Sequence, residues 1–217
     1  MQKIREPGSA ITHFIGMVLA IVSAIPLLTK TLGAHNHINL IAMAIFMSSM
    51  ILLYGASTTY HSVILSEKAT KVFRKIDHMM IFILIAGSYT PMCLIVLDEK
   101  LGKLLLSIVW SIAIVGIIIK AFWITCPKWF SSILYISMGW TCVLAFSQII
   151  HALPVAGFIW LLAGGIIYTV GGIIYALKLP LFNSRHENFG SHEIFHLFVM
   201  GGSICHFIFM YQFLALM

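Results

Sequence analysis

Long stretches of this 217-residue chain contain no Asp, Glu, Lys or Arg: 7–29, 31–66, 78–97, 104–119, 129–177 and 194–217. A helix needs about 20 apolar residues to cross the hydrocarbon core of a bilayer. The longest stretch, 129–177, has room for two such helices, divided at the segment His151-Ala152-Leu153-Pro154. The pattern therefore predicts seven transmembrane helices at about 10–32, 38–62, 75–97, 102–123, 130–150, 155–177 and 190–215.

Composition agrees with this pattern, because 60% of the residues are hydrophobic and only 9% are charged. We expect a single all-α membrane domain, a seven-transmembrane helix bundle over residues 1–217. The first apolar stretch is long enough to span, so we expect a retained helix rather than a cleaved signal peptide. The longest polar connections, 63–74 and 178–189, are about a dozen residues each, so function must reside in the bundle. Paired glycines, Gly164-Gly165 and Gly171-Gly172, predict close helix packing.

The distribution of Lys and Arg predicts the orientation, because cytoplasmic loops are enriched in both. Successive connections between the helices lie on alternate sides of the membrane. On one side these connections contain only Lys30, Lys100 and Lys103. The other side collects Lys3, Arg5, Lys68, Lys71, Arg74, Lys75, Lys120, Lys128, Lys178 and Arg185. We therefore expect a protein of the inner (plasma) membrane with a cytoplasmic N-terminus and an outside C-terminus. This asymmetry explains the net charge of +6, and we expect membrane lipids rather than nucleic acid as partners.

The same topology sorts the ten histidines by depth. One layer near the cytoplasmic face contains His13, His61, His78, His192 and His196, with His186 in the adjacent loop; His35, His37, His151 and His206 fall toward the other side. Ionisable side chains within a bilayer are costly and usually functional. The four cysteines lie apart and suggest neither a disulfide framework nor a zinc ribbon.

Within this layer, His192 and His196 are four residues apart and project from one helix face, about 6 Å apart in rise. Two imidazoles in this arrangement can chelate zinc, and His61 would supply a third nitrogen. Three protein ligands leave a position for water, the pattern of catalytic zinc. Asp77 could orient or deprotonate that water, and Ser57, one turn before His61, could donate a hydrogen bond.

Each of these residues also has a purely structural interpretation. Ser57 could pack in its helix, and His192 and His196 could make hydrogen bonds between helices. Asp77 could form an ion pair with Arg74 or Lys75.

The segment His192-Glu193-Ile194-Phe195-His196 also matches HExxH, in which two histidines bind zinc and the glutamate acts as base. Such proteases need a third ligand further along the chain, but no Asp or Glu follows His196. His206 is the only later histidine and lies about 15 Å further along the helix on another face. Glu193 is turned about 100° from His192. We interpret Glu193 as incidental to the histidine pair.

Together the segments YGASTTYHS, KIDHMMIFILIAGSYTP and SHEIFHLFV resemble the haemolysin III proteins, relatives of the progestin and adiponectin receptors. The resemblance covers essentially the whole chain and implies the same seven spans. It implies that His61, His192 and His196 bind zinc and that Asp77 contacts the zinc-bound water. His78 points away from Asp77 and is expected outside this set.

A further motif of that family, E-x2-N-x3-H, corresponds here to Glu6 and His13, with Ser9 in place of the asparagine. We expect Glu6 and His13 to cap the first helix and close the cytoplasmic mouth rather than to bind metal.

Three classes of function remain. The first is zinc-dependent hydrolysis of a lipid amide or ester, a possibility raised by ceramidase activity in the related receptors, with Asp77 as base and Ser57 as an auxiliary donor. The second is a receptor-like sensor or regulator of membrane lipid state, in which zinc is structural and a lipid-like small molecule is the ligand. The third, a pore, is disfavoured because the outer halves of the spans are overwhelmingly apolar.

Overall fold

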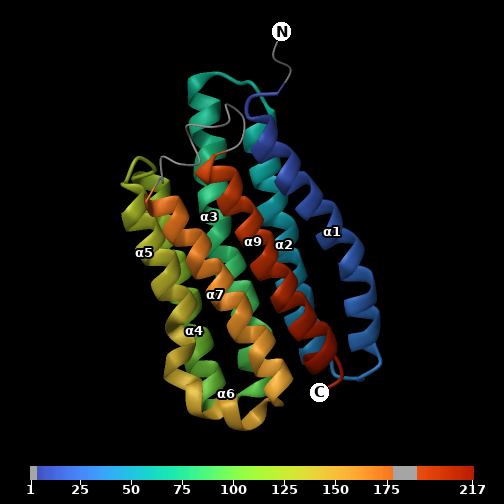
Figure 1. The fold of residues 1–217 in the computed structure, drawn as a ribbon. Helices are drawn as coiled ribbons and strands as arrows, with labels where there is room; N and C mark the ends of the chain where they lie inside the picture. The colour runs from blue at the N-terminus through green and yellow to red at the C-terminus, as the bar shows by residue number, and fades with distance from the viewer. Residues whose placement is uncertain (1–3, 178–189) are drawn as a thin grey trace.

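The computed structural model describes residues 4–177 and 190–217. In these ranges, seven helices are long and apolar enough to cross a membrane. They stand side by side as a bundle with the two termini at opposite ends (Figure 1). The predicted all-α seven-helix bundle is thus confirmed, while the cytoplasmic assignment of the N-terminal end stays a prediction. Lys3, Lys178, Arg185 and His186 lie outside the described residues.

The helix boundaries follow local capping signals. Side chains of Asn36, Ser66 and Asp98 accept hydrogen bonds from backbone N–H groups at the starts of three helices, which satisfies donors that have no partner within the helix. The elements are α1 (Pro7–Leu32), α2 (His37–Ser62), α3 (Glu67–Pro91) with a π-helical turn (Met92–Val96), α4 (Glu99–Phe122), α5 (Lys128–Gly139), a 3₁₀ turn (Trp140–Ala145), α6 (Phe146–Ala152), α7 (Val155–Leu177) and α9 (Ser191–Phe209) with a π-helical turn (Met210–Leu214).

Helix α3 begins at Glu67, eight residues before the predicted start at 75, so the last eight residues of the expected connection over 63–74 are helical. Ser66 caps the helix by accepting a hydrogen bond from the Ala69 N–H at 3.4 Å. Glu67 in the first turn complements the positive end of the helix dipole. These local signals extend the helix beyond the apolar stretch on which the prediction was based.

The fifth span is continuous in the prediction but is interrupted in the structure by the 3₁₀ turn between α5 and α6. Tyr89 from α3 inserts its hydroxyl at this point. The hydroxyl donates to the Gly139 carbonyl at 2.6 Å and accepts from the Cys142 N–H at 2.8 Å. The side chain from another helix therefore replaces backbone hydrogen bonds that the interrupted α-helix lacks.

The most buried helices are α2, α3 and α9, and these three carry the candidate ligands and the candidate base. Helix α2 packs between α1 and α3, and α9 contacts both α7 and α1. Phe46, Phe82 and Phe209 in the shared core are fully buried. The site residues are thus mounted on the best-packed part of the bundle.

Glycines permit several of the close helix approaches. A Cβ atom at Gly171 would lie 2.6 Å from the Phe198 Cβ, and one at Gly164 would overlap the His206 ring, so both glycines face α9. Gly172 instead faces Ile136 of α5, at 3.2 Å, and Gly165 has open space. The packing role predicted from the glycine pairs is confirmed for Gly164, Gly171 and Gly172.

The α2–α3 contact gives a test of this packing. In a Gly87→Ala variant the new methyl would overlap the Ser49 hydroxyl and lie 2.6 Å from the Ser49 Cβ. We expect a loss of about 1–3 kcal/mol in the free energy of unfolding, measured by thermal unfolding in detergent. Ser49→Gly should restore part of it. Gly165→Ala is the matched control, and equal effects of the two alanines would contradict the close contact.

Candidate metal centre

The candidate ligands come from two helix ends that meet near the N-terminal end of the bundle. His61 lies in the last turn of α2, and His192 and His196 lie in the first two turns of α9. Because the two histidines of α9 are four residues apart, their rings lie on one face of the helix. Both rings contact the His61 ring of α2, with centroids 5.0 and 5.2 Å away. The structure therefore brings together the three histidines that the sequence predicts as ligands.

The spacing of the three side chains fits one metal ion. One ring nitrogen from each can be chosen so that all lie within 4.8 Å of one another. The Nε2 atoms of His61 and His192 are 3.3 Å apart. Tetrahedral coordination at a Zn–N distance of about 2.0–2.1 Å would place two ligand nitrogens about 3.3–3.4 Å apart. The same separation also suits an N–H···N hydrogen bond between the two rings.

The other ring nitrogens of His61 and His196 contact the beginning of α1. The Glu6 carboxylate accepts a hydrogen bond from the His61 Nδ1–H. Thr12 donates its hydroxyl hydrogen to the Gly8 and Ser9 carbonyls, so its oxygen can accept from His196 Nδ1, which lies 3.2 Å away. These contacts fix the tautomers of the two rings and leave the Nε2 lone pairs free to bind metal.

The predicted capping of the first helix by the Glu6 and His13 side chains is wrong, and both residues contact the candidate ligands instead. Glu6 occupies the cap position of α1, but its carboxylate makes no capping bond; it binds His61 and, at 3.1 Å, Arg5. The hydrogen bond with His61 lowers the pKa of Glu6 to about 2, so the carboxylate is ionised at neutral pH. His13 stacks on His196, with ring centroids 3.6 Å apart.

Asp77 and Ser57 lie beside the histidines and are both buried. The Asp77 carboxylate is 3.4 Å from His78 Nδ1. Its expected ion pair with Arg74 or Lys75 is not among the salt bridges of the described chain, in which Lys75 instead donates to the Ala121 carbonyl. Ser57 makes no hydrogen bond of good geometry, although its hydroxyl is close enough to stabilise the Asp77 carboxylate.

Glu193 has a structural task away from the ring nitrogens. Its carboxylate accepts hydrogen bonds from the Ser9 hydroxyl at 2.5 Å and from the Gly190 N–H at 2.8 Å. It thereby caps α9 and ties that helix to α1. The engagement of Glu193 agrees with the interpretation of the HExxH segment as a histidine pair alone. His78 lies 2.9 Å through Nδ1 from the Arg74 carbonyl. The expectation that His78 points away from Asp77 is wrong, because the same nitrogen is 3.4 Å from the Asp77 carboxylate.

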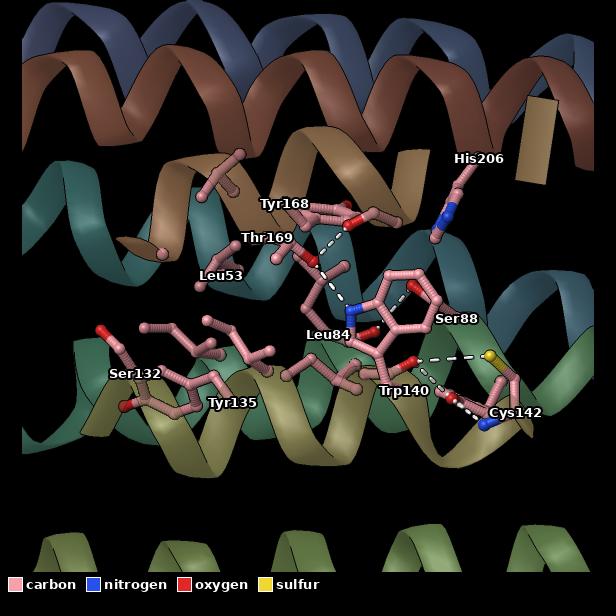
Figure 2. A pocket seen from close by; sticks show the side chains of 18 of the residues that line it. Leu53, Leu84, Ser88, Ser132, Tyr135, Trp140, Cys142, Tyr168, Thr169 and His206 are labelled. Carbon is pink, nitrogen blue, oxygen red and sulfur yellow. Dashed lines mark hydrogen bonds between the residues drawn. The ribbon is translucent and has the colours of Figure 1, made fainter. Parts of the chain in front are cut away.

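The histidine cluster separates two spaces in the bundle. On the side of the N-terminal end is a hollow of about 310 Å³, lined by His61, Glu6 and Lys128 among others. On the other side is a predominantly apolar cavity of about 180 Å³, which extends from Asp77 and Ser57 deep into the bundle. Figure 2 shows the part of it that Trp140 and His206 line. His192 lines both spaces. A ligand could thus approach the cluster from inside while water approaches from the mouth.

Comparison with known proteins identifies the family. The sequence profile described as "Haemolysin-III related" matches residues 1–207. The chain belongs to the haemolysin III family. It is 41% identical to Hemolysin-3 of Bacillus cereus over 198 residues, which cover 91% of this chain and 86% of that protein. It is 39% identical to a Hemolysin-3 homolog of Bacillus subtilis over 203 residues, covering 93% of this chain and 91% of the relative.

More distant relatives of this haemolysin III protein are receptors. The progestin and adipoQ receptor-like protein 1 of Caenorhabditis elegans is 26% identical over 223 residues, which cover 93% of this chain and 50% of the receptor. The seven apolar helices and the bacterial haemolysin relatives together identify a multi-pass protein of the plasma membrane.

Sequence reasoning missed Thr12 and noted Ser9 only as the residue in place of the motif asparagine. Both lie in the first turns of α1, between Glu6 and His13, so the polar residues at the start of the first uncharged stretch were the available signal. Thr12 is one residue from His13 and faces His196. No spacing rule within one helix predicts a contact with a helix 184 residues further along the chain.

Proposed function

We propose that this protein is a zinc-dependent hydrolase that cleaves an amide or ester bond of a membrane lipid. The observation that carries the proposal is the convergence of three imidazole nitrogens beside a buried carboxylate, at the head of an apolar cavity. His61, His192 and His196 would hold the ion. A zinc site with only three protein ligands keeps a position for water and is the usual catalytic arrangement.

Zinc at this position would lower the pKa of its water toward about 7 and polarise the carbonyl that is to be cleaved. Asp77 is the nearby acid or base, because its buried carboxylate lines the same cavity as His192 and His196. It would accept the proton of the attacking water and return it to the leaving group. The Ser57 hydroxyl, which makes no hydrogen bond of good geometry in the structure, would donate to the carbonyl oxygen.

The cavity supports a lipid substrate. Its walls are mainly Leu, Ile, Val and aromatic side chains from α3, α5, α7 and α9, which suit an acyl chain and not a peptide. With the N-terminal end on the cytoplasmic side, as the Lys and Arg distribution predicts, the lipid would enter from the cytoplasmic leaflet. The head group would then lie at the histidine cluster.

A second candidate is a receptor-like regulator of membrane lipid state in which zinc joins α2 and α9 without chemistry. Distant relatives named progestin and adipoQ receptor-like protein 1 and adiponectin receptor protein favour it. A pore, which the name Hemolysin-3 of the Bacillus cereus relative suggests, has less support. A conducting path needs polar side chains through the full membrane thickness, whereas the wall of this cavity is mostly apolar.

Metal content tests the ligand set. Wild-type protein purified in detergent should contain one zinc ion per chain by mass spectrometry, and His196→Ala should lose it. Glu6→Gln should still bind zinc, but about 10-fold to 100-fold more weakly in chelator competition, because the partner of His61 loses its charge. His151→Ala, at an exposed histidine, is the control. Stoichiometric zinc in His196→Ala would refute the site.

Turnover of lipid amides and esters by the zinc-loaded protein separates enzyme from regulator. Asp77→Asn should retain zinc and lose about 10²–10⁴-fold in rate, since general acid–base catalysis typically contributes that much. Glu193→Gln should stay active. Loss of turnover in Glu193→Gln alone would assign the base role to the glutamate. The regulator is favoured if the wild-type protein turns over none of these lipids and the Asp77→Asn variant has the same effect in cells as the wild type.

A further inference from the structure

His206 is a partly buried histidine at the deep end of the cavity. Its ring projects from α9 into the space between the helices (Figure 2). Both ring nitrogens are shielded from solvent and make no hydrogen bond of good geometry, although the Leu161 carbonyl lies within reach as a poorly aligned acceptor. Buried polar groups in proteins almost always have a partner, so an unpaired one suggests a missing ligand or water.

The His206 ring can occupy this position because the residue opposite it in α7 is a glycine. A Cβ atom at Gly164 would overlap the His206 ring and lie 2.6 Å from its Nε2 atom. The edge of the ring also packs against Tyr168, with centroids 5.3 Å apart. The fold thus makes room for an imidazole deep in the bundle. Burying its polar nitrogens without hydrogen bonds costs free energy, and an apolar side chain at this position would avoid that cost.

Other polar side chains at this level are already engaged. The Trp140 indole N–H donates to the Thr169 hydroxyl at 2.9 Å. The Ser88 hydroxyl donates to the Leu84 carbonyl at 2.8 Å. His206 is therefore the group among them that lacks a well-formed hydrogen bond, and Figure 2 shows it on the same cavity as these residues.

Helix geometry sets the distance from His206 to the candidate metal centre. His196 and His206 lie ten residues apart in α9, which is continuous from Ser191 to Phe209, so they are separated by about 15 Å along the axis. Both side chains line the same cavity. An extended acyl chain whose head lies at the histidine cluster would pass His206 after about a dozen carbons.

We propose that His206 binds a hydroxyl group on the lipid chain, about a dozen carbons from the head. A neutral imidazole offers one donor and one acceptor, and a hydroxyl can satisfy either one. The inference rests on the proposed function, because it places the head of the lipid at the histidine cluster. It adds that the substrates are hydroxylated at a defined position and that His206 determines this specificity.

Binding of three fatty acids tests the proposal without turnover, since an acid corresponds to the product of hydrolysis. The probes are octadecanoic acid, 12-hydroxyoctadecanoic acid and 6-hydroxyoctadecanoic acid, titrated calorimetrically into the zinc-loaded protein. One additional hydrogen bond should make the 12-hydroxy acid bind about fivefold more tightly than the other two. Equal affinity of the two hydroxy acids would overturn the proposal and leave water as the partner of His206.

Two variants test whether the His206 imidazole causes the preference for the 12-hydroxy acid. His206→Phe should bind the 12-hydroxy acid no more tightly than octadecanoic acid, whereas His206→Gln, which retains a donor and an acceptor, should keep most of the preference for the 12-hydroxy acid. A preference that survives in His206→Phe overturns the assignment. If His206→Phe does not fold, the isomer comparison in wild type decides.

Failure of the proposed function gives a different result. If none of the three acids binds, or if His61→Ala leaves their affinity unchanged, the head does not lie at the histidine cluster and both proposals fall. If all three acids bind with equal affinity and depend on His61, only the role of His206 is overturned.

Discussion

The structure of the candidate site depends on a constraint that acts on each buried imidazole. A histidine ring has two nitrogens on different sides, and in an apolar interior the nitrogen that does not face a ligand needs its own partner. Helix α1 and the residue before it supply these partners for two of the ligands, since Glu6 binds His61 and Thr12 contacts His196. The Nδ1 atom of His192 has no such partner, and its Nε2 atom lies 3.3 Å from that of His61. Helix α1 thus organises a site to which it contributes no predicted ligand.

Most of the fold could be predicted because the bilayer imposes it on the sequence. Uncharged stretches of span length fixed the number of helices, and the i, i+4 spacing fixed the relation of His192 to His196. The misses arose where tertiary contacts or capping override hydropathy. Ser66 starts α3 early, and the Tyr89 hydroxyl holds open the break after Gly139. Neither interaction can be predicted from the pattern of apolar residues.

The sequence predicts the ligand set, but it does not predict which residues contact the ligands. Three histidines and an aspartate fall into one layer once the topology is known, so their proximity follows from helix order and direction. The partners of their outer nitrogens depend on how α1 rotates against α2 and α9, which hydropathy does not specify. Glu193 illustrates the difference: its spacing within HEIFH suggests a base, but the Ser9 hydroxyl and the Gly190 N–H take up its carboxylate.

The location of the histidine cluster bears on whether the proposed zinc would be catalytic or structural. A structural site is normally closed by four protein ligands, and a position deep among apolar side chains would serve it well. This cluster instead lies between two spaces, and His192 borders both. Asp77 and Ser57 lie on the side of the apolar cavity, where a lipid carbonyl would arrive, while the opposite side opens toward Glu6 and Lys128. Access from both directions supports hydrolysis, because a site that only joined two helices would need neither a route for water nor a buried carboxylate beside it.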